Sequence, residues 1–152
     1  FKKTYHVLLQ VESIVSKGRA LPSVSPLVDA NFLSEVQTFV LTAAHDVAKL
    51  RVPIVLDAST DQDSIKQMNG VSREIYGGDM VMRDAEAVCC SIIYGQDDRS
   101  PISPDTTAAL YVAYAPEGVP AQGVEAHLRA IEANVHLCSP AVKVEQCQVY
   151  TA

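Results

Sequence analysis

The sequence predicts an α/β fold of the α+β kind, in which a single mixed β-sheet of about five strands packs against three helices. Three observations lead to this prediction. Several segments alternate apolar and polar residues, which is typical of half-buried strands. Three others repeat apolar residues at helical spacing. The chain has 152 residues, of which 48% are hydrophobic, and this suits one domain with its own core.

The first predicted element is a strand over residues 4–14. Tyr5, Val7 and Leu9 fall on one face, and Thr4 and His6 fall on the other. Residues 16–30 contain several prolines and serines, so we expect an extended connection there, longer than most loops. Such a connection is typical of a functional loop or an arm.

A helix is predicted over residues 31–50. Its apolar face repeats at helical spacing and consists of Phe32, Val36, Phe39, Val40, Ala43, Val47 and Leu50. Asp29 or Asn31 can cap its start, and Pro53 prevents its continuation. Residues 54–56 then form a short apolar run, which predicts a fully buried strand.

The second half of the chain completes the predicted order β-α-β-α-β-β-α-β. Thr60 and Asp63 resemble a capping pair for a helix that ends at Gly77-Gly78. Strands are expected at 85–94 and 110–114, a helix from Pro120 to Ser139-Pro140, and a closing strand at 141–150. No domain boundary is evident, so residues 1–152 are expected to form one globular domain.

The negative charge is concentrated in the middle of the chain. The net charge is −6. Residues 57–105 hold ten acids and four bases, residues 1–56 carry +2 and residues 106–152 carry −2. This balance argues against a nucleic-acid partner, least strongly for the N-terminal third. The longest apolar run is far shorter than a membrane span, and none is expected.

The most specific candidate for a ligand site follows the strand at residues 54–56. In open α/β sheets, ligands bind beyond the carboxyl ends of the strands and beside the helix starts. This places Asp57, Ser59, Thr60 and Asp61 at a candidate ligand-binding site. Asp57, Ser59 and Thr60 are also candidate catalytic residues, with Arg99 from a later loop as a partner for a carboxylate or phosphate. Helix capping is the simpler explanation of the same Ser, Thr and Asp residues, because helix starts commonly use these residue types.

No metal site or cofactor is predicted. Residues 57–68 place Asp57, Ser59, Asp61 and Asp63 at alternate positions but lack the glycine and glutamate of a calcium loop. Asp61, Asp63, Asp97 and Asp98 remain weak candidates for a looser cation site. The sequence has no glycine-rich phosphate loop, because Gly77-Gly78 follows the predicted helix instead of opening one.

The histidines and cysteines give no catalytic signature. His45 falls on the polar face of the predicted helix, and the four histidines are expected on the surface. The cysteines are Cys89, Cys90, Cys138 and Cys147. No CxxC motif is present, so both disulfides and free thiols stay open, with buried free thiols favoured.

Three functional hypotheses follow from these patterns. The first is a self-assembling or interaction subunit of a larger complex, without its own catalysis. A homo-oligomer is expected in this case, since the strand at 110–114 has a face of small residues. The second is a small-molecule enzyme with a site at Asp57–Thr60, placed at a subunit interface. The third is a cation-dependent binding module built on the acidic loops.

Overall fold

The computed structural model describes residues 6–21 and 23–150, and these divide into two compact units. Unit 1 is built from the chain up to residue 42 and from residue 112 onward, and unit 2 from residues 43–111. The α+β class is confirmed, because three helices and several antiparallel strand pairs make up the described residues. In chain order the elements are α1 (His6–Lys17), α2 (Pro26–Thr38), β1 (Leu41–Asp46), the 3-10 turn η1 (Val47–Lys49), β2 (Val55–Ala58), β3 (Ser64–Lys66), β4 (Ser72–Glu74), β5 (Met80–Arg83), β6 (Val88–Ser91), β7 (Gly95–Gln96), β8 (Ala109–Tyr114) and α3 (Ala121–Cys138).

The first element is a helix, and the prediction of a strand at residues 4–14 is wrong from His6 onward; residues 4 and 5 lie outside the described part. The apolar residues in this segment fit both periods. Leu8, Val11 and Val15 recur at helical spacing, while the alternating residues through Val11 also suit a strand. Neither proline nor glycine interrupts residues 6–17, so a helix can run through them.

Helix α2 starts earlier and ends sooner than the predicted helix over residues 31–50. Ser25 caps its start by accepting a hydrogen bond from the Val28 amide, and Pro26 occupies the first turn. Its end is set at Phe39, which adopts a left-handed φ of 59°. The chain then extends into β1, so only residues 18–25 of the connection predicted at 16–30 lie between helices.

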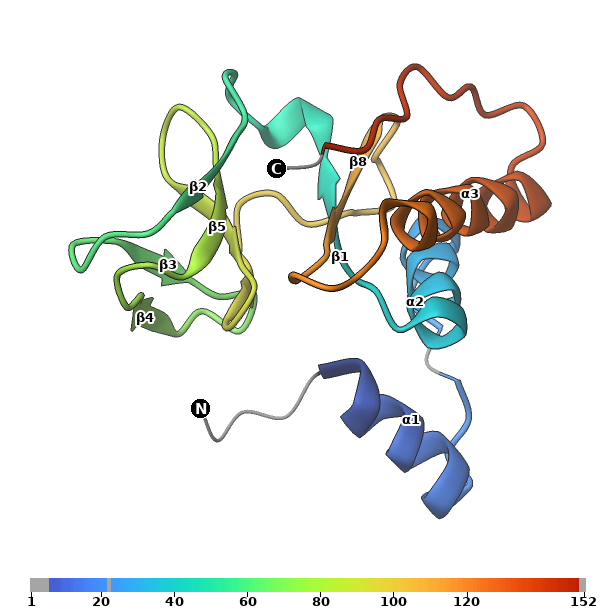
Figure 1. Ribbon diagram of the computed structural model, residues 1–152. Coiled ribbons are helices and arrows are strands. Elements are labelled where there is room, and N and C mark those ends of the chain that lie inside the picture. Colours follow the sequence, from blue (N-terminus) through green and yellow to red (C-terminus); the bar gives the residue numbers. More distant parts are fainter. Residues whose placement is uncertain (1–5, 22, 151–152) are drawn as a thin grey trace. The chain divides into compact units, whose positions relative to one another are not determined.

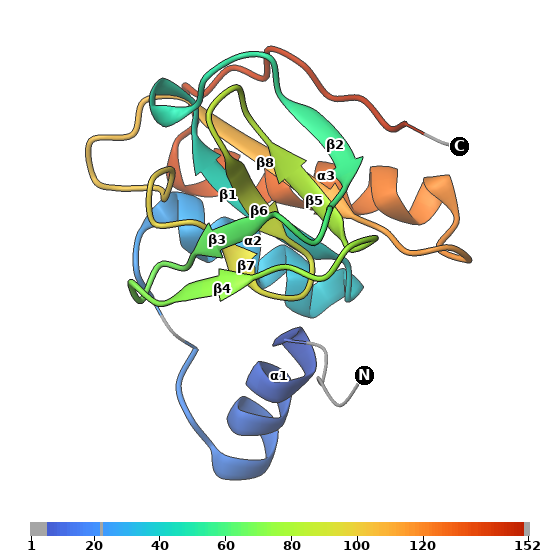
Figure 2. The ribbon, with the colours of Figure 1, turned by 90° about the vertical axis from the view of Figure 1, so that its left-hand side faces the viewer.

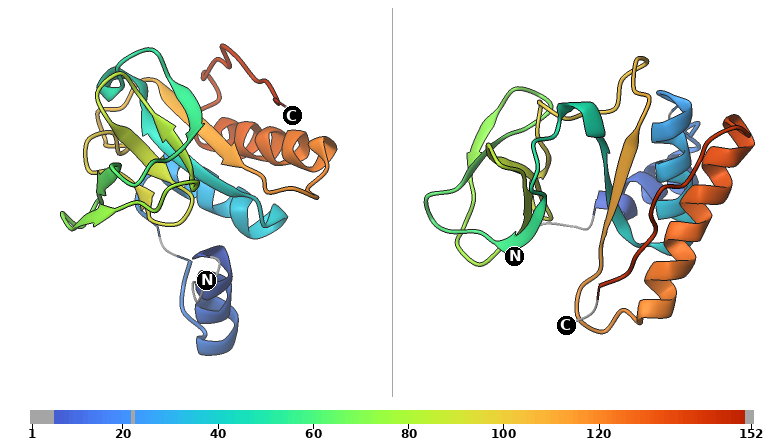
Figure 3. Two further views of the ribbon diagram at one scale, coloured as in Figure 1. Left: turned by 60° about the vertical axis from the view of Figure 1, so that its left-hand side comes forward. Right: turned by 90° about the horizontal axis from the view of Figure 1, so that it is seen from above.

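Helices α2 and α3 pack side by side and carry the core of unit 1 (Figures 1 and 3). Phe32 of α2 and Ile131 and Val135 of α3 are buried. Helix α3 confirms the predicted last helix and ends, as expected, before Ser139-Pro140. Residues 141–150 form no strand, which corrects the predicted closing strand.

Unit 2 contains a four-stranded antiparallel sheet in the order β2-β5-β6-β7. In Figure 2, β2 lies beside β5. Strand β2 confirms the strand expected after Pro53, but its residues are exposed instead of buried. It stands at the edge of the sheet, where only one neighbour covers it. The core of this unit consists of Ile65, Ile75, Val81 and Val88.

The helix predicted after Asp63 is absent, and β3 and β4 form an antiparallel hairpin in its place. The turn lies at Asn69-Gly70. The Gln67 amide donates to the Val71 carbonyl, and the Gly70 amide donates to the Gln67 carbonyl. Gly70 has a φ of 80°, which a residue other than glycine adopts at a cost. Asn-Gly is a strong hairpin signal, and here it outweighs the helical spacing of the apolar residues.

Two features of the predicted architecture are therefore corrected. The observed order begins with two helices and has a run of strands before α3, instead of β-α-β-α-β-β-α-β. The described strands form three separate sheets instead of one, namely the β2-β5-β6-β7 sheet and the pairs β1-β8 and β3-β4. The predicted order assumes helices that cross over between strands. The observed pairs β3-β4, β5-β6 and β6-β7 are antiparallel and are joined by short turns, so no crossover helix is needed between them. The existence of a single domain over residues 1–152 stays a prediction.

Candidate functional site

The predicted strand-end residues lie around β2 and the turn that follows it. Asp57 is exposed in β2, and its carboxylate lies 3.4 Å from Arg83 Nε. Ser59 is buried, and its hydroxyl donates to the Tyr76 carbonyl (2.6 Å) and accepts from the Asp79 amide (2.9 Å). The Ser59 hydroxyl is thus used to hold β2 to the turn before β5.

Thr60 and Asp63 form a local turn. The Thr60 amide and hydroxyl both donate to Asp63 Oδ2. Arg83 also makes a two-bond contact with the Asp63 carboxylate, at 3.1 and 3.0 Å. The hydrogen bond from Arg83 is the main reason that the pKa of Asp63 falls to about 2. No helix begins here, so the helix amides expected to bind an anion are not present at this position.

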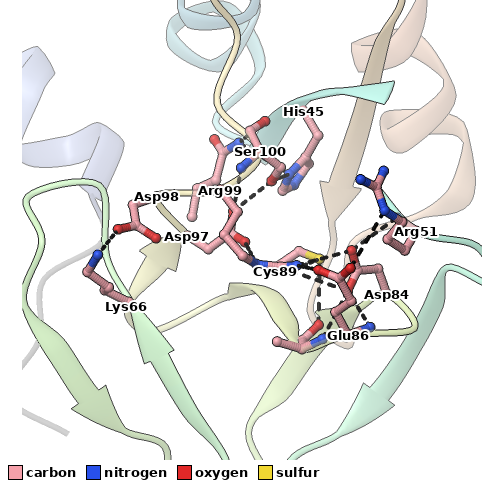
Figure 4. Close-up of polar contacts among 12 residues, drawn as sticks. His45, Arg51, Lys66, Asp84, Glu86, Cys89, Asp97, Asp98, Arg99 and Ser100 are labelled. Carbon is pink, nitrogen blue, oxygen red and sulfur yellow. Dashed lines mark hydrogen bonds and ion pairs between the residues drawn. The ribbon is translucent and has the colours of Figure 1, made fainter. Parts of the chain in front are cut away.

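Arg99 lies in a dense ionic cluster of unit 2 (Figure 4). Its guanidinium contacts Asp97 (2.9 Å), Asp84 (3.2 Å) and Glu86 (2.9 Å). Its Nη2 also lies 3.4 Å from Cys89 Sγ. The sequence suggests that Arg99 pairs with an acidic group of a substrate. In the structure, three carboxylates of the chain itself contact the guanidinium group.

Asp84 is the buried centre of this cluster. Burial by itself would raise its pKa, but the amides of Ala87, Glu86 and Arg51 donate to its carboxylate. Together with Arg99, these bonds outweigh burial and lower the Asp84 pKa to about 2. The side chain therefore stays ionised and ties the β5–β6 turn to residue 51 and to the loop after β7.

A second chain of contacts runs from His45 to Asp97 through Ser100, and all three side chains are almost completely buried. The Ser100 hydroxyl donates to Asp97 Oδ1 (2.6 Å) and lies 2.7 Å from His45 Nδ1. A serine hydroxyl has one hydrogen, and Asp97 receives it. His45 Nδ1 also lies 3.2 Å from the side-chain amide nitrogen of Gln96, so this buried ring nitrogen has two polar neighbours.

His45 Nε2 has no hydrogen-bond partner among the described residues. Burial lowers the pKa of His45 to about 4, which keeps the ring neutral at pH 7. This geometry differs from a serine-nucleophile triad, in which the carboxylate orients the histidine and the histidine accepts the serine proton. Here Asp97 accepts the serine proton directly, and Ser100 joins the two side chains.

The candidate cation ligands are each engaged elsewhere. Asp61 Oδ1 accepts from the Gly77 amide. Asp63 pairs with Arg83, Asp97 with Arg99, and Asp98 with Lys66 at 2.6 Å. Within residues 6–21 and 23–150, no group of three or more His, Cys, Asp or Glu side chains is placed to hold a metal ion.

The cysteines are all free. Cys89 and Cys90 are buried in β6, and Cys138 and Cys147 are exposed. Burial is the main reason that the pKa of Cys89 rises to about 11, so its thiol stays protonated. This matches a buried thiol that packs as a small apolar side chain.

The prediction of surface histidines is wrong for His45 and His127, both of which are fully buried. His45 lies in β1 instead of on a helix face. His127 lies on the inner face of α3 and contacts the hydroxyls of Thr38 and Thr42 through its two ring nitrogens. A histidine at a core position needs such polar partners, and sequence spacing gives no sign of them because the partners are distant in the chain.

Strand β2 also presents an apolar surface. Leu56, Ala58 and Met80 lie on one face of the β2–β5 pair, because Leu56 is opposite Met82 and Ala58 is opposite Met80. Leu56 is 50% exposed and Met80 is 40% exposed. Met82, which lies opposite Leu56 on the same face, is fully buried. We call Leu56, Ala58 and Met80 the β2 surface.

Comparisons with known proteins give no identification. No protein-family model matches this chain, and no curated protein matches it. Among the described residues, none of the helices has the length and apolarity that a membrane crossing requires.

Proposed function

We propose that this chain is a self-associating interaction subunit, without catalysis of its own, and that it associates through the β2 surface. The observation that carries the proposal is the edge strand. All four residues of β2 are exposed, although two of them, Val55 and Leu56, are large and apolar.

An exposed edge strand of this kind favours association for two reasons. Burying Leu56 removes apolar area from water, which is worth about 25 cal/mol for each Å². The outer edge of β2 also offers backbone groups to a partner, and proteins usually protect such edges with charge or proline. Asp57 is the only charged residue in β2, and Arg83 compensates it.

The polar cluster around Arg99 supports the same proposal. Its carboxylates are satisfied by Arg99, Arg51 and backbone amides. Such a network stabilises the fold of unit 2 and leaves its ionic groups with little capacity to bind a substrate.

Substitution of Leu56 tests the proposal. Leu56→Glu places a charge on the β2 surface and is expected to lower the association constant by about tenfold or more. Gln62→Glu is the control, because Gln62 is exposed in the neighbouring turn and the added charge is the same. Equal association of the wild type and Leu56→Glu, measured by light scattering after gel filtration, would contradict the proposal.

The enzyme hypothesis and the cation-binding hypothesis remain predictions. Asp57→Asn tests the enzyme hypothesis, because it removes the charge of a candidate catalytic residue. Melting curves recorded with calcium and with EDTA test the cation-binding hypothesis.

A further inference from the structure

We propose that Asn69 is a site of spontaneous deamidation, in which the backbone nitrogen of Gly70 attacks the side-chain amide and the products are aspartate and isoaspartate. The inference is independent of the proposed function, because it concerns a covalent change within the β3–β4 hairpin. It follows from the glycine after Asn69, from the open surroundings of the turn, and from a hydrogen bond to the Asn69 side chain.

The Asn69-Gly70 turn joins β3 to β4 and is exposed to solvent. Because glycine has no side chain, nothing on the following residue hinders attack by its backbone nitrogen. A Cβ atom placed on Gly70 would have no heavy atom within 4 Å among the described residues other than its chain neighbours. The turn therefore has room for the succinimide ring that the attack closes, and for the water that opens this ring.

The side-chain carbonyl of Asn69 is held by the backbone of the same turn. Asn69 Oδ1 accepts a hydrogen bond from the Val71 amide at 3.0 Å. This bond keeps the side chain folded toward the residues that follow it. A donor at this oxygen also stabilises the negative charge that develops there when the carbonyl carbon is attacked. The contact with Val71 therefore favours attack at Asn69 Cγ.

One hydrogen bond opposes the reaction and must open first. The Gly70 amide donates to the Gln67 carbonyl at 2.7 Å, and the nitrogen has to give up this proton. The bond lies beyond the last strand pair of the hairpin, Lys66 with Ser72. An exposed hairpin tip opens at a small cost in free energy. The rest of the hairpin stays closed meanwhile, because Ile65 is buried in the core of unit 2.

The reaction needs water and no oxidant or reductant. The Gly70 nitrogen forms a bond to Asn69 Cγ, and the bond from Cγ to Nδ2 breaks. The Gly70 amide proton passes through water to Nδ2, which leaves as ammonia. Water then opens the succinimide. Attack at Cγ gives aspartate, and attack at the main-chain carbonyl carbon gives isoaspartate. Either product carries a carboxylate in place of a neutral amide.

Two further asparagines in the chain serve as internal controls. Asn31 lies in α2 and Asn134 lies in α3, and large side chains follow them at Phe32 and Val135. A large following side chain hinders the attacking nitrogen, and a helix engages its backbone amides in hydrogen bonds. We therefore expect Asn69 to react at least about tenfold faster than either control.

Mass spectrometry of tryptic peptides measures these rates in the native chain. Trypsin cuts after Lys66 and Arg73, so the peptide of residues 67–73 contains Asn69 and no other asparagine. Its deamidated fraction is followed during incubation, and fragmentation assigns the mass gain to residue 69. The rate is expected to rise about tenfold or more between pH 6 and pH 8, because the attack requires removal of the Gly70 amide proton.

Asn69→Gln is the matched variant, because it keeps a side-chain amide before Gly70 but would have to close a larger ring. Isoaspartate is detected with a protein isoaspartyl methyltransferase and a labelled methyl donor. The wild type is expected to gain this label on incubation, and Asn69→Gln is expected to gain almost none. A label that appears equally in both proteins would place the isoaspartate elsewhere and would overturn the inference.

Comparison with the unfolded chain tests whether the hairpin permits the reaction. The wild type is incubated in buffer and in guanidinium chloride at the same pH and temperature. The native rate at Asn69 is expected to lie within about tenfold of the unfolded rate, since only the tip has to open. A larger decrease would show that the bond from Gly70 to Gln67 protects Asn69, which overturns the inference. Equal native rates at Asn69, Asn31 and Asn134 would overturn it as well.

Discussion

The carboxylate of Glu35 in α2 accepts a hydrogen bond from the backbone amide of Thr42 in β1, at 2.7 Å. This contact spans the end of α2 and the left-handed residue Phe39, so one side chain fixes the sharp change from helix to strand. Glu35 is buried, and burial raises its pKa to about 7, although the Thr42 amide acts in the opposite direction.

Because the pKa of Glu35 is raised, ionisation of this side chain is expected to lower the free energy of unfolding as the pH rises. The folded state holds the proton more tightly than the unfolded state, whose pKa is near 4.5. This contribution to stability is fully present below pH 4.5 and is lost as the pH rises to and above 7. Glu35→Gln keeps an acceptor for Thr42 but cannot ionise. Relative to the wild type, it is expected to gain about 3 kcal/mol between pH 4.5 and pH 8.

Urea unfolding at several pH values measures this difference. Glu145→Gln is the control, because it makes the same substitution at an exposed position. A constant difference between Glu35→Gln and the wild type across the whole range would show that Glu35 has no raised pKa.

The ionic cluster predicts unequal effects for two acids that contact the same arginine. Asp84 is buried and accepts three backbone amides, whereas the Glu86 side chain is 58% exposed. Asp84→Ala is expected to cost about 3–5 kcal/mol, because it leaves buried donors and part of Arg99 unpaired. Glu86→Ala is expected to cost less than about 1 kcal/mol. Similar losses in thermal or urea unfolding would contradict the described cluster.

The β3–β4 hairpin predicts the sign of a glycine substitution. Gly70 has a φ of 80°, so Gly70→Ala is expected to destabilise the protein by about 1 kcal/mol. Gly123 lies within α3 and has room for a methyl group, so Gly123→Ala is expected to stabilise it by about 0.5 kcal/mol. If residues 63–76 were a helix, Gly70→Ala would also be stabilising. The direction of the change in melting temperature separates the two structures.

The correctly predicted elements are those in which the spacing of apolar residues and the flanking residues indicate the same structure. Helix α3 combines a regular apolar stripe with Pro120 before it and Pro140 after it. Strand β8 alternates Leu110, Val112 and Tyr114 as expected. Each is specified by local periodicity, which a single sequence carries in full.

The wrongly predicted elements carry two competing signals. In the segment around Asn69-Gly70, the apolar spacing suits a helix and the turn residues suit a hairpin, and packing of Ile65 and Ile75 into the core of unit 2 favours the hairpin. The helix predicted across residue 39 ends there, and the buried Glu35 carboxylate accepts a hydrogen bond from the Thr42 amide at the start of β1. The spacing of apolar residues does not reveal a buried contact of this kind.

The candidate site was predictable only in part. The acidic character of residues 57–105 is visible in the sequence, whereas the ion pairs of Arg99 with Asp84, Glu86 and Asp97 are not. The joining of His45, Ser100 and Asp97 is not, because residues 45 and 100 are distant in the chain and no motif links them. The exposure of Leu56 was missed as well, since an apolar run predicts burial.

Self-association can be measured by sedimentation equilibrium of the wild-type chain over a wide range of dilution. If the chain associates through the β2 surface, the average mass rises with concentration above the 16.4 kDa of one chain. Leu56→Glu is then expected to shift this rise to higher concentration. A mass of one chain at every concentration, for both proteins, would show that the chain does not self-associate.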